Sequence, residues 1–160
     1  MTITPFLWFD TQAEEAMNYY LSVFKNGKAK TVHRTQGRVM SVEFELEGQH
    51  FMALNGGRPS RFTESISFFV SCETQAEIDR LWTTLTGDGG APSRCGWLKD
   101  KFGLSWQIIP SSLGRLLSGG GDGARAGRVL NAMLQMDKLD IARLQQAYDG
   151  HQPGTQTELK

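Results

Sequence analysis

Two cysteines are the most reactive side chains of this sequence. Cys95 precedes Gly96-Trp97 and lies close to Lys99. A thiolate held beside a cation can act as a nucleophile in covalent catalysis. No histidine lies nearby in the sequence to activate Cys95, so a small packed thiol is the simpler interpretation. With Cys72 it makes no disulfide framework, and we expect both cysteines to be reduced thiols in the cytoplasm.

Carboxylates alternate with apolar side chains along the predicted strand 38–46. Ser41, Glu43 and Glu45 share one face of this strand, and the apolar residues share the other. A solvated face is the simplest interpretation of this pattern. The alternative is that the carboxylates line a pocket, where they would favour a cationic ligand or act as general bases.

Composition narrows the class of protein. The chain has 160 residues, of which 39% are hydrophobic, enough for one compact domain with a core. Seventeen basic residues balance seventeen acidic ones, which gives no reason to expect nucleic-acid binding. No apolar run approaches the ~20 residues of a membrane helix. The N-terminus carries no secretion signal, so we expect a cytoplasmic protein that is not bound to a membrane.

An internal repeat organises the elements that must position these side chains. The tetrapeptide Thr11–Glu14 recurs letter for letter as Thr74–Glu77, each time after a short apolar run. Thr-x-x-Glu is a capping box, in which both side chains satisfy free amides of the first helical turn. Apolar residues at helical spacing follow each copy, and Gly27 and Gly87 are expected to end the helices. The repeat indicates a duplicated half-domain, although two unrelated strand–helix units would give the same pattern.

Further strands follow each predicted helix, so each half has the order β-α-β-β-β. In the first half we predict strands at 29–35, 38–46 and 49–54. In the shortened second half we predict strands at 93–98 and 104–109, with a hairpin at 100–103.

The domain organisation follows from these elements. Residues 1–110 hold the paired modules, at about 1–57 and 62–110. Residues 111–149 are predicted to be a C-terminal helical extension of the same domain, with two helices after a flexible glycine-rich link at 118–123. Residues 150–160 are predicted to be a disordered tail.

Several segments resemble the vicinal oxygen chelate superfamily, which has the glyoxalase and bleomycin-resistance fold. Within it they are similar to the PhnB-like branch, often labelled 3-demethylubiquinone-9 3-methyltransferase. The resemblance covers about residues 3 to 149, and its most specific segment is Cys95–Pro110. The other segments are Pro5–Phe9, Tyr19-Tyr20, Phe51–Gly57, Ile66–Val70 and Ala132–Met136. The resemblance implies an α+β fold, in which two βαβββ modules form a cupped mixed sheet with helices outside. It also implies a homodimer whose cup holds a small molecule, often with a divalent metal.

The resemblance places one metal ligand on the first and one on the last strand of each module. These positions fall at Gln107, Ser65, Asn55 and either Ile3 or Pro5. Neutral amides and hydroxyls are poor ligands for divalent cations, so we expect no metal and no cofactor. Glu64, next to Ser65, and His50, at the entry to its strand, would rescue a metal site if the register slips. We interpret His33 and His50 as partly exposed strand residues.

Strand alternation then predicts the side chains that face the cup. Ser105 and Ile109 join Gln107, Ser67 and Phe69 follow Ser65, and Phe51 and Ala53 join Asn55. The predicted ligand-binding residues are Asn55, Ser65, Ser67, Phe69, Ser105 and Gln107. This mixture of small polar groups and aromatic rings suits an uncharged or weakly polar ligand. The alternative is that the polar groups satisfy only one another or buried water.

Three functions are compatible with these residues, and the sequence leaves the ligand open. The favoured one is a metal-free, small-molecule binding and sequestering dimer. The alternative is an enzyme of the same superfamily: a metal-dependent lyase, isomerase or dioxygenase, or a thiol transferase. The methyltransferase of the branch label has the least support. Its cofactor would require a glycine-rich turn directly after a strand, whereas Gly119–Gly121 lies between helical stretches.

Overall fold

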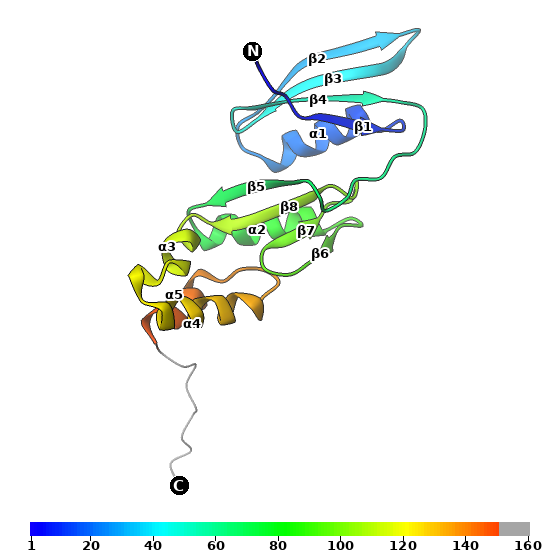
Figure 1. The fold of residues 1–160 in the computed structure, drawn as a ribbon. Helices are drawn as coiled ribbons and strands as arrows, with labels where there is room; N and C mark the ends of the chain where they lie inside the picture. Colours follow the sequence, from blue (N-terminus) through cyan, green and yellow to red (C-terminus); the bar gives the residue numbers. More distant parts are fainter. Residues whose placement is uncertain (151–160) are drawn as a thin grey trace. The chain divides into compact units, whose positions relative to one another are not determined.

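The computed structural model describes residues 1–150, and their α+β fold divides into two compact units, Met1–Arg61 and Phe62 onward. Each unit begins with a βαβββ module around a four-stranded mixed sheet (Figure 1). Apart from Gly150, the predicted disordered tail 150–160 lies outside the described residues. Within the described residues, no helix is both long and apolar enough to cross a membrane.

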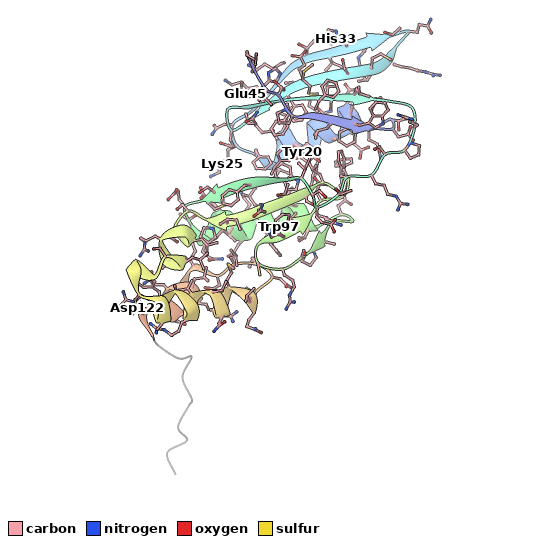
Figure 2. All side chains as sticks on the ribbon, in the orientation of Figure 1. Tyr20, Lys25, His33, Glu45, Trp97 and Asp122 are labelled. Atoms are coloured by element: carbon pink, nitrogen blue, oxygen red, sulfur yellow. The ribbon has the colours of Figure 1, made fainter. Side chains whose placement is uncertain are left out.

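The first sheet has the strand order β1-β4-β3-β2, with β1 parallel to β4 and the other pairs antiparallel. Helix α1 covers one face of it, from which Tyr20 points to the sheet (Figure 2). Tyr20 stacks on Phe44 there, and Phe44 stacks on Phe51. The elements are β1 (Phe6–Phe9), α1 (Ala13–Val23), β2 (Gly27–Thr35), β3 (Arg38–Leu46) and β4 (Gln49–Asn55).

The second sheet repeats this topology in the order β5-β8-β7-β6, with β5 parallel to β8. This shared order favours a duplicated half-domain over two unrelated units. The elements are β5 (Ser67–Cys72), α2 (Gln75–Thr86), β6 (Ala91–Pro92), β7 (Trp97–Lys99) and β8 (Ser105–Pro110).

The predicted strand 93–98 is partly wrong, because a turn interrupts it. Cys95 and Gly96 both have positive φ, at 57° and 85°, and so cannot continue an extended strand. The hairpin predicted at 100–103 is confirmed. Buried Asp100 holds it, accepting hydrogen bonds from the N–H groups of Phe102 and Leu104 and from Trp106 Nε1.

The two copies of the tetrapeptide cap their helices differently. In the second, Thr74 is the N-cap of α2, and its side chain and that of Glu77 form the predicted capping box. In the first, the predicted box is wrong, because α1 begins at Ala13 and Thr11 lies outside the capping position. Asn55 Oδ1, at the end of β4, accepts the Ala13 N–H instead, at 2.8 Å. In the first module, Asn55 of β4 thus accepts a hydrogen bond from the N-terminal turn of the helix, as the N-cap side chain of Thr74 does in the second module.

Of the two glycines predicted to end the helices, Gly87 does so and Gly27 does not. Gly87 is the C-cap of α2, as predicted. Helix α1 ends earlier, at Val23, and Gly27 is the first residue of β2.

The C-terminal extension packs on the second sheet within the second unit (Figure 1). Its elements are α3 (Leu113–Leu117), a 3₁₀ turn η1 (Gly119–Gly121), α4 (Gly123–Leu134) and α5 (Ile141–Asp149). The two predicted helices are therefore present, while α3 was not predicted. The expected flexible link holds the 3₁₀ turn and the N-cap Asp122. Ile109 of β8 joins the apolar cluster of the extension, whose fully buried members include Leu116, Val129 and Leu144.

Candidate functional site

The open face of the second sheet carries the side chains that α2 does not cover. Neighbouring residues of parallel strands in register point to the same side. Ser67, Phe69 and Ser71 of β5 therefore share a face with their partners Ser105, Gln107 and Ile109 of β8. Trp97 of β7 pairs with Gln107 and lies on this face too (Figure 2). The opposite face packs Phe68 against Trp106, and Ile108 and Cys72 are buried there.

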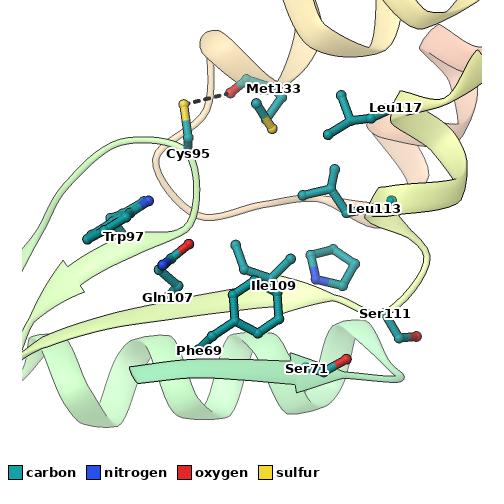
Figure 3. Close-up of a pocket in the computed structure, with 12 residues that line it drawn as sticks. Phe69, Ser71, Cys95, Trp97, Gln107, Ile109, Ser111, Leu113, Leu117 and Met133 are labelled. Carbon is teal, nitrogen blue, oxygen red and sulfur yellow. Dashed lines mark hydrogen bonds between the residues drawn. The ribbon is translucent and has the colours of Figure 1, made fainter. Parts of the chain in front are cut away.

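A pocket of about 440 Å³ lies where this face meets the extension (Figure 3). This volume is within the range of small-molecule sites. Its apolar lining comes from Phe69, Trp97, Ile109, Leu113, Leu117 and Met133. Its polar lining comes from Ser71, Ser111, Gln107 and Cys95. None of the lining residues carries a charged side chain.

Gln107 supplies the one amide side chain of the lining. Its Nε2 donates a hydrogen bond to Ser67 Oγ at 2.9 Å, which fixes the side chain across β8 and β5. The carbonyl oxygen Oε1 points toward the turn that carries Cys95 (Figure 3). A carbonyl held in this way can accept a hydrogen bond from an N–H or O–H group of a ligand.

Cys95 reaches the pocket from the turn between β6 and β7. Its Sγ donates to the Met133 carbonyl at 3.6 Å (Figure 3). Its backbone N–H donates to the Met136 carbonyl at 2.8 Å, so the turn is tied to the end of α4. The other thiol, Cys72, lies on the opposite face and is 2% exposed. Burial raises the pKa of Cys72 to about 11, so its reactive thiolate form is suppressed.

The structure brings together four of the six predicted ligand-binding residues. Ser67, Phe69, Ser105 and Gln107 share the open face, and Phe69 and Gln107 line the pocket. Ser105 is 1% exposed, and its Oγ has no hydrogen-bond partner among the described residues. Ser65 precedes β5 in an exposed segment, where its N–H donates to Thr63 Oγ1.

In the first unit, the predicted orientation of the strand that ends at Asn55 is wrong. Phe51 and Ala53 are buried on the side of the first sheet that α1 covers, and Met52 and Leu54 face the other side. The side-chain amide of Asn55 is already engaged, since Oδ1 accepts the Ala13 N–H and Nδ2 donates to the Val39 carbonyl. The side chain that caps α1 therefore cannot also point to the open face.

The carboxylates of β3 lie on the open face of the first sheet, in ion pairs with partly exposed partners. Glu45 contacts Lys30 at 3.3 Å, and Glu43 contacts His50 Nε2 at 3.4 Å. The predicted alternation of β3 is confirmed, and the solvated face and the pocket lining both stay predictions.

The positions at which the fold family places a metal do not fit a divalent cation. Asn55 and Gln107 present amides with hydrogen bonds of their own, and Ser65 presents a hydroxyl. Glu64 pairs with Lys99 at 3.2 Å, and its own backbone N–H and the Lys99 ammonium lower the pKa of its carboxyl. Among residues 1–150, no cluster of three histidine, cysteine, aspartate or glutamate side chains is close enough to hold a metal.

Sequence reasoning missed the part of the pocket that the extension contributes. Leu113 and Leu117 come from α3, which is too short to show helical periodicity. Met133 of α4 and Trp97 of β7 also line the pocket, although neither was among the predicted ligand-binding residues. No local signal distinguishes these residues from core residues, because only their approach to the sheet makes them lining residues.

In a comparison with known protein families, residues 1–109 match the family described as 3-demethylubiquinone-9 3-methyltransferase. The solved PhnB protein from Bacillus cereus is 35% identical with a TM-score of 0.64, and the match covers 69% of this chain and 99% of that one. Protein PA1353 from Pseudomonas aeruginosa is 19% identical with a TM-score of 0.57, and 69% and 97% of the two chains are covered.

The gene product At5g48480 from Arabidopsis thaliana is 16% identical with a TM-score of 0.50, and 68% and 98% of the two chains are covered. At their low identities, the Pseudomonas and Arabidopsis proteins show a shared fold only. A comparison with curated proteins found no match.

Proposed function

This chain belongs to the 3-demethylubiquinone-9 3-methyltransferase-like (PhnB) family, and we propose that it binds a small, neutral, largely aromatic molecule without a metal. The resemblance found in the sequence is thereby confirmed as a family membership. The chemistry of the pocket indicates the class of ligand.

The uncharged, largely apolar lining of the pocket carries this proposal. Phe69 offers an aromatic ring that is 61% exposed on the sheet face, and Trp97 lines the same pocket. Aromatic rings contribute to binding by burying large apolar areas and by stacking. A charged ligand would lose its hydration here without gaining a partner of opposite charge, which is costly. A neutral aromatic ligand is therefore favoured.

Gln107 adds the polar component of recognition. Its Nε2 is engaged with Ser67, so Oε1 is the group that the side chain can offer. A ligand with an N–H or O–H donor at the edge of its ring would satisfy this acceptor, whereas a ligand without one would leave it buried and unpaired. We therefore propose a ligand with a single donor group on an aromatic body.

The enzyme alternatives have less support from the residues. A metal-dependent reaction would need ligands that the expected positions do not provide. A thiol transferase would use Cys95, which does reach the pocket, but no histidine or carboxylate lines the pocket to activate it. A methyltransferase would need a cofactor site, and the glycines 119–121 form a 3₁₀ turn between helices rather than a turn after a strand.

Two further aspects of the proposal rest on the sequence. We propose a homodimer, as the family resemblance implies. We also propose a cytoplasmic location, because Cys72 and Cys95 are both free thiols, as a reducing compartment would keep them.

Titration with N-phenyl-1-naphthylamine, a neutral aromatic amine with one N–H donor, tests the proposal. Its fluorescence rises in apolar surroundings, and we expect saturable binding and a rise in melting temperature. Phe69→Ala and Trp97→Ala should each weaken binding. Ile66→Ala is the matched control, because Ile66 is 70% exposed in the same unit and outside the pocket.

The competing functions predict different responses in the same assay. S-adenosylmethionine, nickel, zinc, manganese and iron are tested one at a time. Stabilisation by a metal ion would favour the enzyme, and stabilisation by S-adenosylmethionine would favour the methyltransferase. Either result, with no response to the aromatic amine, would overturn the proposed function.

A further inference from the structure

The pocket has two walls of different origin. The sheet wall, with Phe69, Trp97 and Gln107, belongs to residues 1–109, which match the family model. The other wall comes from Leu113, Gly114, Leu117 and Met133 of the C-terminal extension, which lies beyond that match. The match to the Bacillus cereus PhnB protein likewise covers 99% of that chain but only 69% of this one. The extension wall is therefore a feature that this chain adds to the matched region.

The extension wall is held firmly in place. The Gln75 side chain of α2 donates to the Leu139 carbonyl at 3.1 Å and accepts the Ile141 N–H at 2.9 Å. On the other side, the backbone N–H groups of Cys95 and Gly96 donate to the carbonyls of Met136 and Asp137. The segment between α4 and α5 is thus bonded both to α2 and to the turn that carries Cys95. These bonds fix the segment that follows Met133, and the apolar cluster holds α3 through Leu113 and Leu116.

Gly114 stands out within this wall. Leu113 and Leu116 anchor the short helix α3 in the apolar cluster, and Gly114 lies beside them and lines the pocket. Its φ lies outside the left-handed region, and an added Cβ would meet no atom within 4 Å. Neither the backbone nor the packing of the chain requires glycine here, and glycine is a poor helix former. Gly114 is exposed, and of the described glycines whose added Cβ would meet no atom within 4 Å it is the one that lines the pocket, so the open space beside it is on the pocket side of α3.

We infer that α3 is the specificity-determining wall of the pocket, and that Gly114 leaves room for a second ring of the ligand. This inference rests on the proposed function, since it concerns the same pocket. It adds that the ligand is larger than a single fused ring pair and that the extension, rather than the family module, sets its size. A side chain at position 114 would fill the space that the outer ring occupies.

The test compares two probes that differ in size. N-phenyl-1-naphthylamine carries a phenyl ring beyond its naphthalene, whereas 1-naphthol carries only an O–H donor on the naphthalene. We expect Gly114→Leu to weaken binding of the larger probe by about tenfold or more, because overpacking of this kind is costly. Binding of 1-naphthol should change by less than about threefold. Gly114→Ala, which adds a single methyl group, should shift the ratio of the two affinities in the same direction by less.

Gly123→Leu is the matched control, because Gly123 lies in the same extension, meets no atom within 4 Å and does not line the pocket. It should leave both affinities unchanged. Equal losses for both probes in Gly114→Leu, or no loss for either, would overturn the inference while the proposed function stands. Failure of the unmodified protein to bind either probe would overturn the proposed function itself, and the inference with it. Circular dichroism shows whether the Gly114→Leu protein is folded. If it is unfolded, the ratio of the two probe affinities in Gly114→Ala tests the inference instead.

Discussion

Gln107 Nε2 donates to Ser67 Oγ at 2.9 Å, and this bond joins β8 to β5 at the floor of the pocket. It also decides which end of the amide a ligand meets. The carbonyl oxygen remains as the acceptor on the pocket side (Figure 3).

The first prediction concerns this acceptor. Gln107→Leu should weaken binding of N-phenyl-1-naphthylamine by about fivefold, since a neutral hydrogen bond contributes about 1 kcal/mol net. Binding of 1-phenylnaphthalene, which lacks the N–H, should not weaken. Fluorescence titration of both probes measures the difference. Parallel losses for the two probes would assign Gln107 a packing role rather than a hydrogen-bonding one.

The second prediction concerns the two helix caps. Thr74→Ala should lower the free energy of unfolding by about 1 kcal/mol, because it removes the side chain that caps α2. Asn55→Ala should cost about 1–2 kcal/mol, since it removes the partners of both Ala13 and Val39. Thr11→Ala, in the same tetrapeptide as Thr74, should stay within about 0.5 kcal/mol of the unmodified protein. Urea unfolding compares the three, and a large loss in Thr11→Ala would contradict the different capping of the two copies.

The third prediction concerns the reactivity of the thiols. At pH 8 iodoacetamide should modify Cys95 in the folded protein while Cys72 stays unmodified, because burial raises the pKa of Cys72 to about 11. A saturating aromatic probe should slow the modification of Cys95, which lines the pocket. Mass spectrometry of peptides reports both sites at once, with Cys72 as the internal control. Modification of Cys95 at an unchanged rate in the presence of bound probe would place the probe elsewhere.

The fourth prediction concerns stability at alkaline pH. The folded-state pKa of Cys72 lies above the ordinary value of 9.0, so the folded protein holds this proton more tightly than the unfolded chain. The resulting stabilisation is complete below pH 9 and is lost as the pH rises toward 11. Cys72→Ala should therefore show a shallower loss of unfolding free energy across this window. Identical slopes for the two proteins in urea unfolding between pH 8 and 11 would refute this linkage.

The fifth prediction contrasts two glycines. Gly114→Ala should raise the free energy of unfolding by about 0.5–1 kcal/mol, because the helix improves and the added methyl group meets nothing. Gly56→Ala should lower it by about 1–3 kcal/mol, since its Cβ would overlap the indole ring of Trp8. Thermal and urea unfolding measure both. Destabilisation by Gly114→Ala would mean that the fold, and not a ligand, requires this glycine.

Much of the fold could be predicted because its signals are local. Alternation of apolar residues located β3 within its exact bounds, and it placed β2 and β4 to within two residues at either end. The capping box located the start of α2, because an N-cap side chain bonds only to the turn that follows it. The alternation along β8 also predicted that Ser105, Gln107 and Ile109 share a face, which the pairing with β5 confirms.

The errors come from contacts between distant segments. The first tetrapeptide has the residues of a capping box, but the amide of Asn55, forty-two residues away, bonds to the start of the helix instead. The same bond turns Asn55 toward α1, and with it Phe51 and Ala53 face the core. The predicted alternation of β4 is right, but its Phe51 side packs under α1 and not on the open face, because burying these apolar side chains stabilises the core.

Residue types and their spacing were enough to predict the family, the two βαβββ modules and the uncharged side chains that β5 and β8 present on their shared face. Those properties depend on periodicity and residue type, which can be read over a few turns or strands. Only the tertiary structure decided that α3 and α4 would pack against that face and turn Leu113, Leu117 and Met133 into lining residues. A pocket is the space between segments, and its shape depends on how elements distant in the sequence pack together.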